Sequence, residues 1–358
     1  MHDDGRMRRL FEQKGPVMTV WVNRPEPVPA TIAARVRSVH DAVGKVLPGD
    51  AADAVDNALS EGFEQSPAMV LVVGNEGIRL AHTATSPLRF EATLFGELPA
   101  LAPVIGDLQT SIPFVLAMVD RRGADLYWST PDGEGSRSVE GDDTYLRKVQ
   151  AGGWSHKTYQ QRAENTWEHT AAEVAGELEQ IVRRIDARLV ILASEERMEQ
   201  SLREHLQPEI VELVRDVSGS RTRDGSDDER RDQVERWIRS AVAEDTVAAL
   251  QLFEQERGQA DRAASGAAET FEALRQSRVD TLLIHDDGSQ QRTAFFDRDE
   301  PGLVALDRTT FADLGRDPAG PARLHDVAIR ACVLTGAGVR VVPEHTRLDE
   351  GIGAILRW

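Results

Sequence analysis

The sequence predicts an α/β fold in three domains, and three observations point to it. Its 358 residues exceed the roughly 100 to 200 of one ordinary domain. Its 41% of hydrophobic and 28% of charged residues are close to the average of globular proteins. Short apolar runs typical of strands alternate with segments whose apolar residues recur every three or four positions, as in amphipathic helices. We expect domains at residues 1–112, 113–274 and 275–358.

The first domain, residues 1–112, is expected to be α/β with a mixed sheet. The expected elements are a strand at 17–22, helices at 30–46 and 51–63, and a hairpin of strands 69–73 and 78–82. The hairpin is predicted because Gly74-Asn75-Glu76-Gly77 supplies residues that accept the positive φ of tight turns. Prolines at 99, 103 and 113 mark the exit from this domain.

The central domain is expected to open with strands 114–119 and 124–128 around the turn Asp120-Arg121-Arg122-Gly123. Residues 131–143 are rich in Gly, Ser and acids, which indicates an exposed loop or a weak edge strand. A helix at 157–184 follows, with an apolar stripe of Ala163, Trp167, Ala171, Val174, Leu178, Ile181 and Ile185. The later expected elements are strand 189–193, helix 195–205, strand 210–215, a loop at 218–228 and a long helix that weakens toward Ala267.

The last domain, residues 275–358, is expected to be a small α/β sandwich. Its expected elements are a strand at 279–285, a helix at 321–334, a strand at 339–342 and the closing segment 351–358. The single cysteine, Cys332, excludes a disulfide within the chain and a multi-cysteine metal cluster. Because Cys332 stands in an apolar run, we expect a buried core thiol.

Charge narrows the classes of partner. A net charge of −18 opposes general binding to DNA or to anionic membranes, since such binding neutralises phosphates with Lys and Arg. No apolar run approaches the roughly 20 residues of a membrane helix, and we expect a cytoplasmic protein. Any contact with nucleic acid must therefore be local.

Motifs of the common enzyme classes do not occur, and we expect no cofactor and no metal. His156 and His169 lie near the start of one predicted helix without a partner at metal-ligand spacing, which favours solvated or capping roles. The acids Asp227-Asp228-Glu229 precede the long helix, where carboxylates offset the helix dipole. Helix capping is favoured over catalysis there.

One segment departs from the acidic background. Residues 146–163 contain Arg147, Lys148, Lys157 and Arg162 and no acid, and Gly152, Gly153 and Trp154 stand at their centre, followed by Ser155 and His156. Two glycines allow a close approach to another surface, and a tryptophan can stack on a base. On composition alone, an ordinary glycine turn before a helix is favoured over a nucleic-acid-binding tip.

Three places resemble the archaeo-eukaryotic release factor and Pelota superfamily, and within it the bacterial branch that includes the ribosome hibernation factor Balon. FVLAMVDRRGADLYW, from Phe114, is similar to the start of the family's central domain. Gly152-Gly153-Trp154-Ser155, with the helix after it, stands where releasing members carry Gly-Gly-Gln. The strand at 279–285 and GIGAILRW at the end resemble the family's C-terminal domain. The resemblance implies a three-domain release-factor/Pelota-like architecture.

The departure at Trp154 affects the function that the resemblance implies. In releasing members the glutamine helps to place the water that attacks peptidyl-tRNA. Indole offers one donor and no acceptor, so Trp154 is unsuited to this task. The resemblance therefore implies no catalytic residue and a non-hydrolytic, monomeric tRNA mimic in the ribosomal A site, beside EF-Tu in some members.

On this interpretation Trp154 stacks on an rRNA or tRNA base, and Arg147, Lys148, Lys157 and Arg162 contact phosphates. Two alternatives stay open. One is a peptidyl-tRNA hydrolase or rescue release factor with an altered loop. The other is a protein-interaction scaffold that works off the ribosome.

Overall fold

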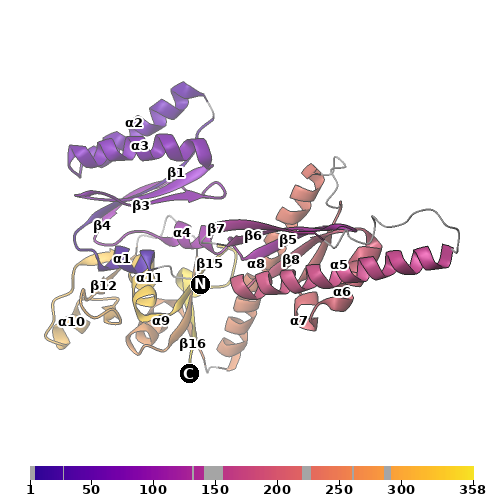
Figure 1. Cartoon of the computed structure of the whole chain (residues 1–358). Helices are drawn as coiled ribbons and strands as arrows, with labels where there is room; N and C mark the ends of the chain where they lie inside the picture. The colour runs from indigo at the N-terminus through magenta and orange to yellow at the C-terminus, as the bar shows by residue number, and fades with distance from the viewer. Residues whose placement is uncertain are drawn as a thin grey trace. The chain divides into compact units, whose positions relative to one another are not determined.

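A computed structural model describes most of the chain, and Figure 1 shows its elements. The described ranges are 5–26, 28–130, 133–140, 156–219, 227–259, 262–285 and 292–358, with the backbone alone for 156–167 and 227. The chain divides into two units. Unit 1 contains residues up to Gln109 together with Thr246–Trp358, and unit 2 contains Thr110–Asp245. The finer division at 112 and 274 stays a prediction.

The N-terminal part of unit 1 is built on a four-stranded sheet in the order β3-β2-β1-β4. Its strands are β1 (Val17–Asn23), β2 (Ala68–Gly74), β3 (Gly77–Ala84) and β4 (Ala92–Gly96). Every pair in it is antiparallel, so the expected mixed sheet is wrong in this detail. Because β2 and β3 form a hairpin and β4 returns beside β1, no parallel crossover occurs.

Helices α2 (Pro29–Gly44) and α3 (Gly49–Gln65) cover one face of this sheet. Their apolar sides, which include Val39, Val43, Val55 and Leu59, pack on the side chains of alternate strand residues, as the two helical stripes in the sequence predict. Figure 1 shows the two helices lying together above the strands.

The C-terminal part of unit 1 contains a mixed sheet and a small antiparallel one, in the orders β10-β16-β11-β15 and β13-β12-β14. The larger sheet consists of β10 (Ala263–Ser265), β11 (Val279–His285), β15 (Gly338–Val342) and β16 (Ile352–Leu356). The smaller consists of β12 (Thr293–Phe296), β13 (Val304–Ala305) and β14 (Pro321–Arg323). The helices are α9 (Gly266–Arg275), α10 (Thr309–Asp313), α11 (Leu324–Thr335) and the 3₁₀ turn η2 (Asp349–Gly351).

Both ends of the chain contribute to one hydrophobic core in unit 1. Helix α11 lies at its centre, and Val327, Ile329 and Cys332 are fully buried. Helices α1 (Arg6–Glu12) and α4 (Ala102–Leu108) and the second face of the N-terminal sheet pack into the same core. The burial of Cys332 confirms the expected core thiol.

Polar contacts also join the two parts of unit 1. The side-chain amide of Gln109 donates to the carbonyl of Val341 at 2.7 Å and accepts from its N–H at 3.0 Å, which satisfies a peptide of strand β15. The guanidinium of Arg323 lies 5.6 Å from the ring centroid of Trp21. The N-terminal sheet is therefore attached to the C-terminal part by hydrogen bonds as well as by apolar packing.

Unit 2 is built on a five-stranded mixed sheet in the order β7-β6-β5-β8-β9. Its strands are β5 (Phe114–Asp120), β6 (Gly123–Thr130), β7 (Gly133–Glu140), β8 (Leu189–Ala193) and β9 (Val214–Val217). Its helices are α5 (His156–Ile185), α6 (Glu196–His205) and α7 (Pro208–Val211), and α8 (Asp227–Gln259) continues into unit 1. The expected mixture of helices and strands is confirmed, and β7 is the edge strand that the Gly- and Ser-rich segment allowed.

Three expected elements are corrected. The strand expected at 210–215 is helix α7 followed by β9, because Pro208 opens a helical turn and the extended chain starts only at Val214. The helix expected from residue 321 starts at Leu324, since Pro321–Arg323 pairs with β12. The long helix ends at Gln259, and Ala263–Ser265 is the strand β10.

Asp326 gives unit 1 a testable pH dependence. Its side chain is 3% exposed in the first turn of α11, and the Arg323 guanidinium lies 3.9 Å from its carboxylate. Burial raises the pKa of Asp326 to about 7, although Arg323 favours the charged form. The folded protein therefore binds a proton that the unfolded chain releases above its ordinary pKa near 3.8.

We predict that the free energy of unfolding of unit 1 rises as the pH falls from 8 toward 5, by about 0.7 kcal/mol per pH unit at pH 7 and by up to about 1.4 kcal/mol per pH unit nearer pH 5. Asp326→Asn should remove this slope, because asparagine has the same shape and no titration. Denaturant unfolding at several pH values measures it. The buried Asp107 does not interfere, because hydrogen bonds from His82 and Thr85 outweigh its burial and hold its pKa below the ordinary value. An unchanged slope in the variant would show that Asp326 is not the titrating group.

A candidate nucleic-acid-binding loop and its supporting helix

The candidate loop joins strand β7 to helix α5. Gly152, Gly153, Trp154 and Ser155 lie outside the described residues, as do Arg147 and Lys148. His156, Lys157 and Arg162 lie on α5 within its first turns, where the backbone alone is described. The structure therefore describes the elements on either side of the loop.

Helix α5 is held by its C-terminal half. Of the apolar stripe in the sequence, Ala171, Val174, Leu178 and Ile181 are buried against the sheet and against helix α6, and Ile185 is half-buried. The side chains of Ala163 and Trp167 lie outside the described part. Among the residues of α5 whose side chains are described, Thr170 is the first that is buried, and Glu168 and His169 before it are exposed. Since a helix rises 1.5 Å per residue, about 20 Å of α5 separates His156 from Thr170.

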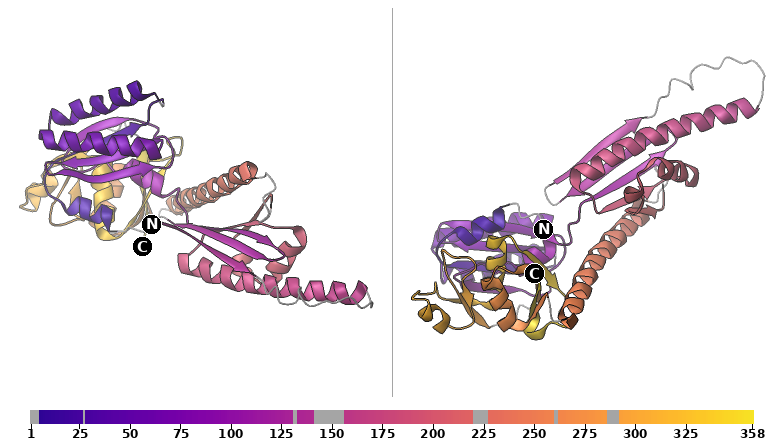
Figure 2. Two further views of the ribbon diagram at one scale, coloured as in Figure 1. Left: turned by 45° about the horizontal axis from the view of Figure 1, so that its top comes forward. Right: turned by 90° about the horizontal axis from the view of Figure 1, so that it is seen from below.

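Figure 2 shows the N-terminal part of α5 continuing beyond the ends of the strands of unit 2. On the exposed side of α5, the His169 imidazole lies 3.3 Å from the Glu173 carboxylate, one helical turn along. Such an exposed pair contributes little to stability and is consistent with the solvated role expected for His169. In the described ranges, no group of three or more His, Cys, Asp or Glu side chains could hold a metal.

The edge strand β7 fixes the other side of the loop. Arg137 on β7 forms a two-fold contact with Glu177 on α5, with nitrogen to oxygen distances of 2.9 Å for both pairs. The Nη2 group donates a hydrogen bond to Oε1, while the contact of Nη1 with Oε2 is an ion pair without hydrogen-bond geometry. The strand that enters the loop is thus attached to the helix that leaves it, which the sequence did not predict because residues 131–143 carry no apolar alternation.

Trp128 on β6 makes a second contact with α5. The Arg184 guanidinium lies 4.6 Å from the indole centroid, within the range of cation–π attraction. The ring also lies against Gly135 on β7, and a Cβ built on Gly135 would stand 2.3 Å from the indole carbon Cζ2. Only glycine leaves room for the ring, so Gly135 and Arg184 together set its position.

The turn between β5 and β6 has the geometry that its sequence predicts. The Asp120 carboxylate accepts from the N–H groups of Arg122 and Gly123 at 2.8 and 3.1 Å. Gly123 has φ of 153°, and a Cβ there would stand 1.9 Å from the carbonyl oxygen of Val139. Arg121 pairs with Glu195 at 3.1 Å. The hairpin expected from Asp-Arg-Arg-Gly is confirmed.

The acids at the start of α8 lie inside the helix. The helix begins at Asp227, so Asp228 and Glu229 belong to its first turn, where negative charge is favourable. Asp228 is almost fully exposed and lies 3.7 Å from Arg231. The acids that were expected to precede the helix therefore lie within its first turn.

Comparison with known proteins identifies the central region. Residues 113–259 match the family model described as bacterial archaeo-eukaryotic release factor family 2. This region, less than half of the chain, is similar to the archaeo-eukaryotic release-factor-like superfamily. The uncharacterized proteins Rv2629 and MT2704, from two strains of Mycobacterium tuberculosis, are each 25% identical over 371 residues, covering 99% of this chain and 96% of theirs.

Solved structures of the superfamily are also similar. Archaeal Pelota, in a model of ribosome-bound archaeal Pelota and ABCE1, is 14% identical with a TM-score of 0.42, covering 99% of this chain and 94% of its own. Pelota of Archaeoglobus fulgidus is 15% identical with a TM-score of 0.36, covering 99% and 92%. Within the described residues, no helix is both long and apolar enough to span a membrane.

The packing of Trp128 gives a prediction about the support of the loop. Gly135→Ala should lower the stability of unit 2 by about 1 to 3 kcal/mol, because the methyl group must displace the indole from Arg184. Gly176→Ala, on the open side of α5, should instead stabilise by up to about 1 kcal/mol, since nothing lies within 4 Å and alanine favours a helix. Thermal unfolding of both variants measures the difference, and equal effects would contradict the assigned packing.

Proposed function

We propose that this chain is a ribosome-binding, translation-factor-like protein of the cytoplasm. It occupies the A site of idle ribosomes as a monomeric tRNA mimic and does not hydrolyse peptidyl-tRNA. The observation that carries the proposal is the match of residues 113–259 to a release-factor family, combined with Trp154 where releasing members have glutamine. EF-Tu, which accompanies some members of the branch that the sequence resembles, is one candidate companion on the ribosome.

The design of unit 2 supports a loop that acts at a distance from its core. Among the described side chains of α5, burial starts at Thr170, and about 20 Å of helix lies between that residue and His156. A helix is the stiffest way to hold a short segment away from a domain. The contacts of Arg137 and Arg184 keep the base of this helix fixed on the sheet.

The residues of the loop suit binding better than hydrolysis. Trp154 offers an aromatic face to a base, and such stacking contributes about 1 to 3 kcal/mol. Gly152 and Gly153 let the backbone approach closely. Arg147, Lys148, Lys157 and Arg162 add charge for phosphates, with Ser155 and His156 beside them. None of these side chains carries the amide of the glutamine that places water in releasing members.

Ribosome binding should depend on Trp154. Trp154→Ala should lower co-sedimentation with ribosomes from starved cells about tenfold, as expected from the loss of one stacked base. Trp154→Phe keeps an aromatic face and should retain most of the binding, which separates stacking from a general disturbance of the loop. A Trp154→Ala protein that sediments like the wild type would remove the stacking role from the proposal.

The enzyme alternative makes a different prediction about peptide release, which a second substitution of Trp154 tests. The wild type should release no peptide from peptidyl-tRNA on the ribosome above the rate without added protein. Trp154→Gln restores the side chain of releasing members and could raise this rate if the loop enters the reaction centre. Substantial release by the wild type would replace our proposal with a hydrolase or rescue factor. Failure to sediment with ribosomes from both growing and starved cells would favour a scaffold that works elsewhere.

A further inference from the structure

Helix α1 carries a local positive charge that the function of the loop does not use. The segment Arg6–Lys14 contains four cations, Arg6, Arg8, Arg9 and Lys14, and one acid, Glu12, in a chain of net charge −18. Its apolar side chains Met7, Leu10 and Phe11 are buried in the core of unit 1. The helix is thus fixed on unit 1 with Arg8, Arg9 and Lys14 exposed.

Two arginines from distant parts of the chain meet at the end of helix α11. The Arg8 guanidinium donates to the carbonyls of Val333 and Leu334 at 3.3 and 3.2 Å. The Arg357 guanidinium donates to the carbonyl of Gly336 at 3.4 Å. Cations there are favoured by the helix dipole, so capping accounts for the placement of this pair. Each guanidinium has five N–H groups, and both side chains keep donors for another ligand.

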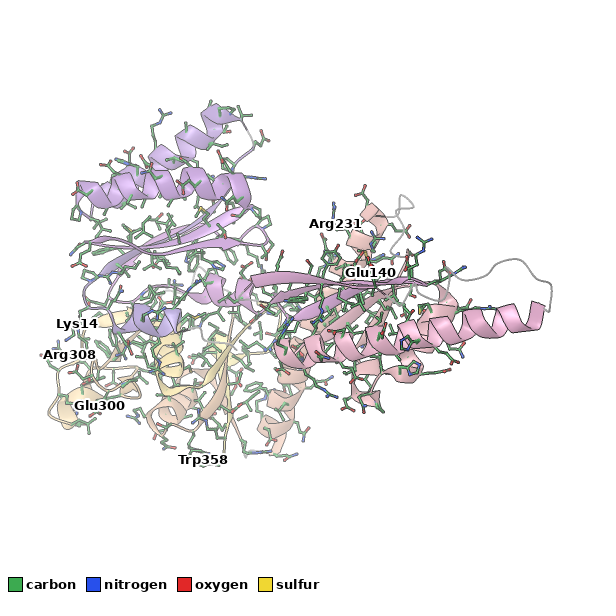
Figure 3. The ribbon with its side chains drawn as sticks, in the orientation of Figure 1. Lys14, Glu140, Arg231, Glu300, Arg308 and Trp358 are labelled. Carbon is green, nitrogen blue, oxygen red and sulfur yellow. The ribbon has the colours of Figure 1, made fainter. Side chains whose placement is uncertain are left out.

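Capping does not account for three further cations on the same side. Arg79 on β3 donates to the main-chain carbonyl of Lys14 at 3.2 Å, which brings its guanidinium next to the end of the α1 segment. Within the described part of the chain, neither Arg9 nor Lys14 forms a side-chain hydrogen bond or ion pair that fixes it. Figure 3 labels Lys14 at the junction between the N-terminal and C-terminal parts of unit 1.

We call this set the α1 surface; its members are Arg8, Arg9, Lys14, Arg79 and Arg357. Among the described residues, no carboxylate forms an ion pair with any of the five. By contrast, Arg298, Arg316 and Arg323 of the same unit each pair with an acid. Within the α1 segment itself, four cations stand beside the single acid Glu12, which is exposed.

We propose that the α1 surface binds the phosphate backbone of RNA. Guanidinium and ammonium groups without acidic partners are the groups that contact phosphate. Because these groups are spread over α1, β3 and the residue after β16, they suit the several phosphates of an RNA strand better than a single small anion. This contact reads no sequence, because it involves no base edge. It rests on the proposed function in one respect, since ribosomal RNA would be the RNA bound.

The test uses the full chain and two matched variants. Arg9→Glu with Lys14→Glu changes two exposed side chains of the α1 surface and leaves the capping contacts of Arg8 and Arg357 in place. Arg37→Glu with Lys45→Glu makes the same change of charge on α2 and the residue after it, at exposed cations outside the surface. Thermal unfolding establishes that both variants are folded, and Arg9→Lys with Lys14→Arg preserves the charge as a third variant.

Binding is measured to a 20-base-pair RNA duplex by fluorescence anisotropy at several salt concentrations, without ribosomes. The α1 variant should bind at least about tenfold more weakly, and the slope of log K against log salt should fall by about 2, one for each phosphate that is no longer neutralised. The α2 variant and the charge-preserving variant should bind like the wild type. Equal losses of affinity in the α1 and α2 variants would show a general charge effect and overturn the proposal.

The same measurement separates this inference from the proposed function. If ribosome binding depends on Trp154 but the α1 variant binds both ribosomes and duplex RNA as tightly as the wild type, the inference about the α1 surface alone is overturned. A wild type that binds duplex RNA through the α1 surface but never sediments with ribosomes would overturn the proposed function alone. If polyglutamate competes as well as RNA at equal charge concentration, the surface takes an acidic protein, and RNA binding is rejected.

Discussion

The core that both ends of the chain share in unit 1 is the constraint on which the rest of the structure depends. Helix α11 is buried on all sides, by the N-terminal sheet and helices α1 and α4 as well as by the C-terminal strands. Complete burial forces its polar side chains into the interior. Arg330, 2% exposed, donates to the carbonyl of Arg298 and lies over Phe296, and Asp326 has a raised pKa. The same burial fixes α1, and so determines which of its arginines remain outside.

The candidate loop depends on a different core. Helix α5 packs on the sheet of unit 2 through residues such as Val174 and Leu178, none of which contributes to the core of unit 1. The loop and the α1 surface therefore rest on separate hydrophobic cores, and effects on the two should be additive in the absence of ribosomes.

The sequence was sufficient for elements whose apolar pattern is strong. Strands 189–193 and 279–285 have the expected bounds, and α5 differs by one residue at each end, because long periodic or fully apolar runs leave little choice. It was insufficient where a short segment is set by its neighbours. Strand β7 has almost no apolar residue and exists because β6 pairs with it, and Pro321–Arg323 is extended because β12 does the same. The candidate loop could be found from Gly-Gly-Trp and its cations, but the contacts of Arg137, Gly135 and Arg184 that support it join residues distant in sequence and leave no local pattern.

The distribution of charge decides how an acidic chain can bind RNA at all. At physiological ionic strength the screening length is about 8 Å, so a phosphate at a surface responds to the side chains around it more than to the total of −18. The loop segment 146–163 and the α1 segment are both short runs in which cations outnumber acids. The remaining surface repels phosphate and thereby opposes binding to RNA in other orientations. For the proposed binding to ribosomal RNA, an acidic chain with a few cationic segments gains orientation from the same charges that weaken its general affinity for RNA.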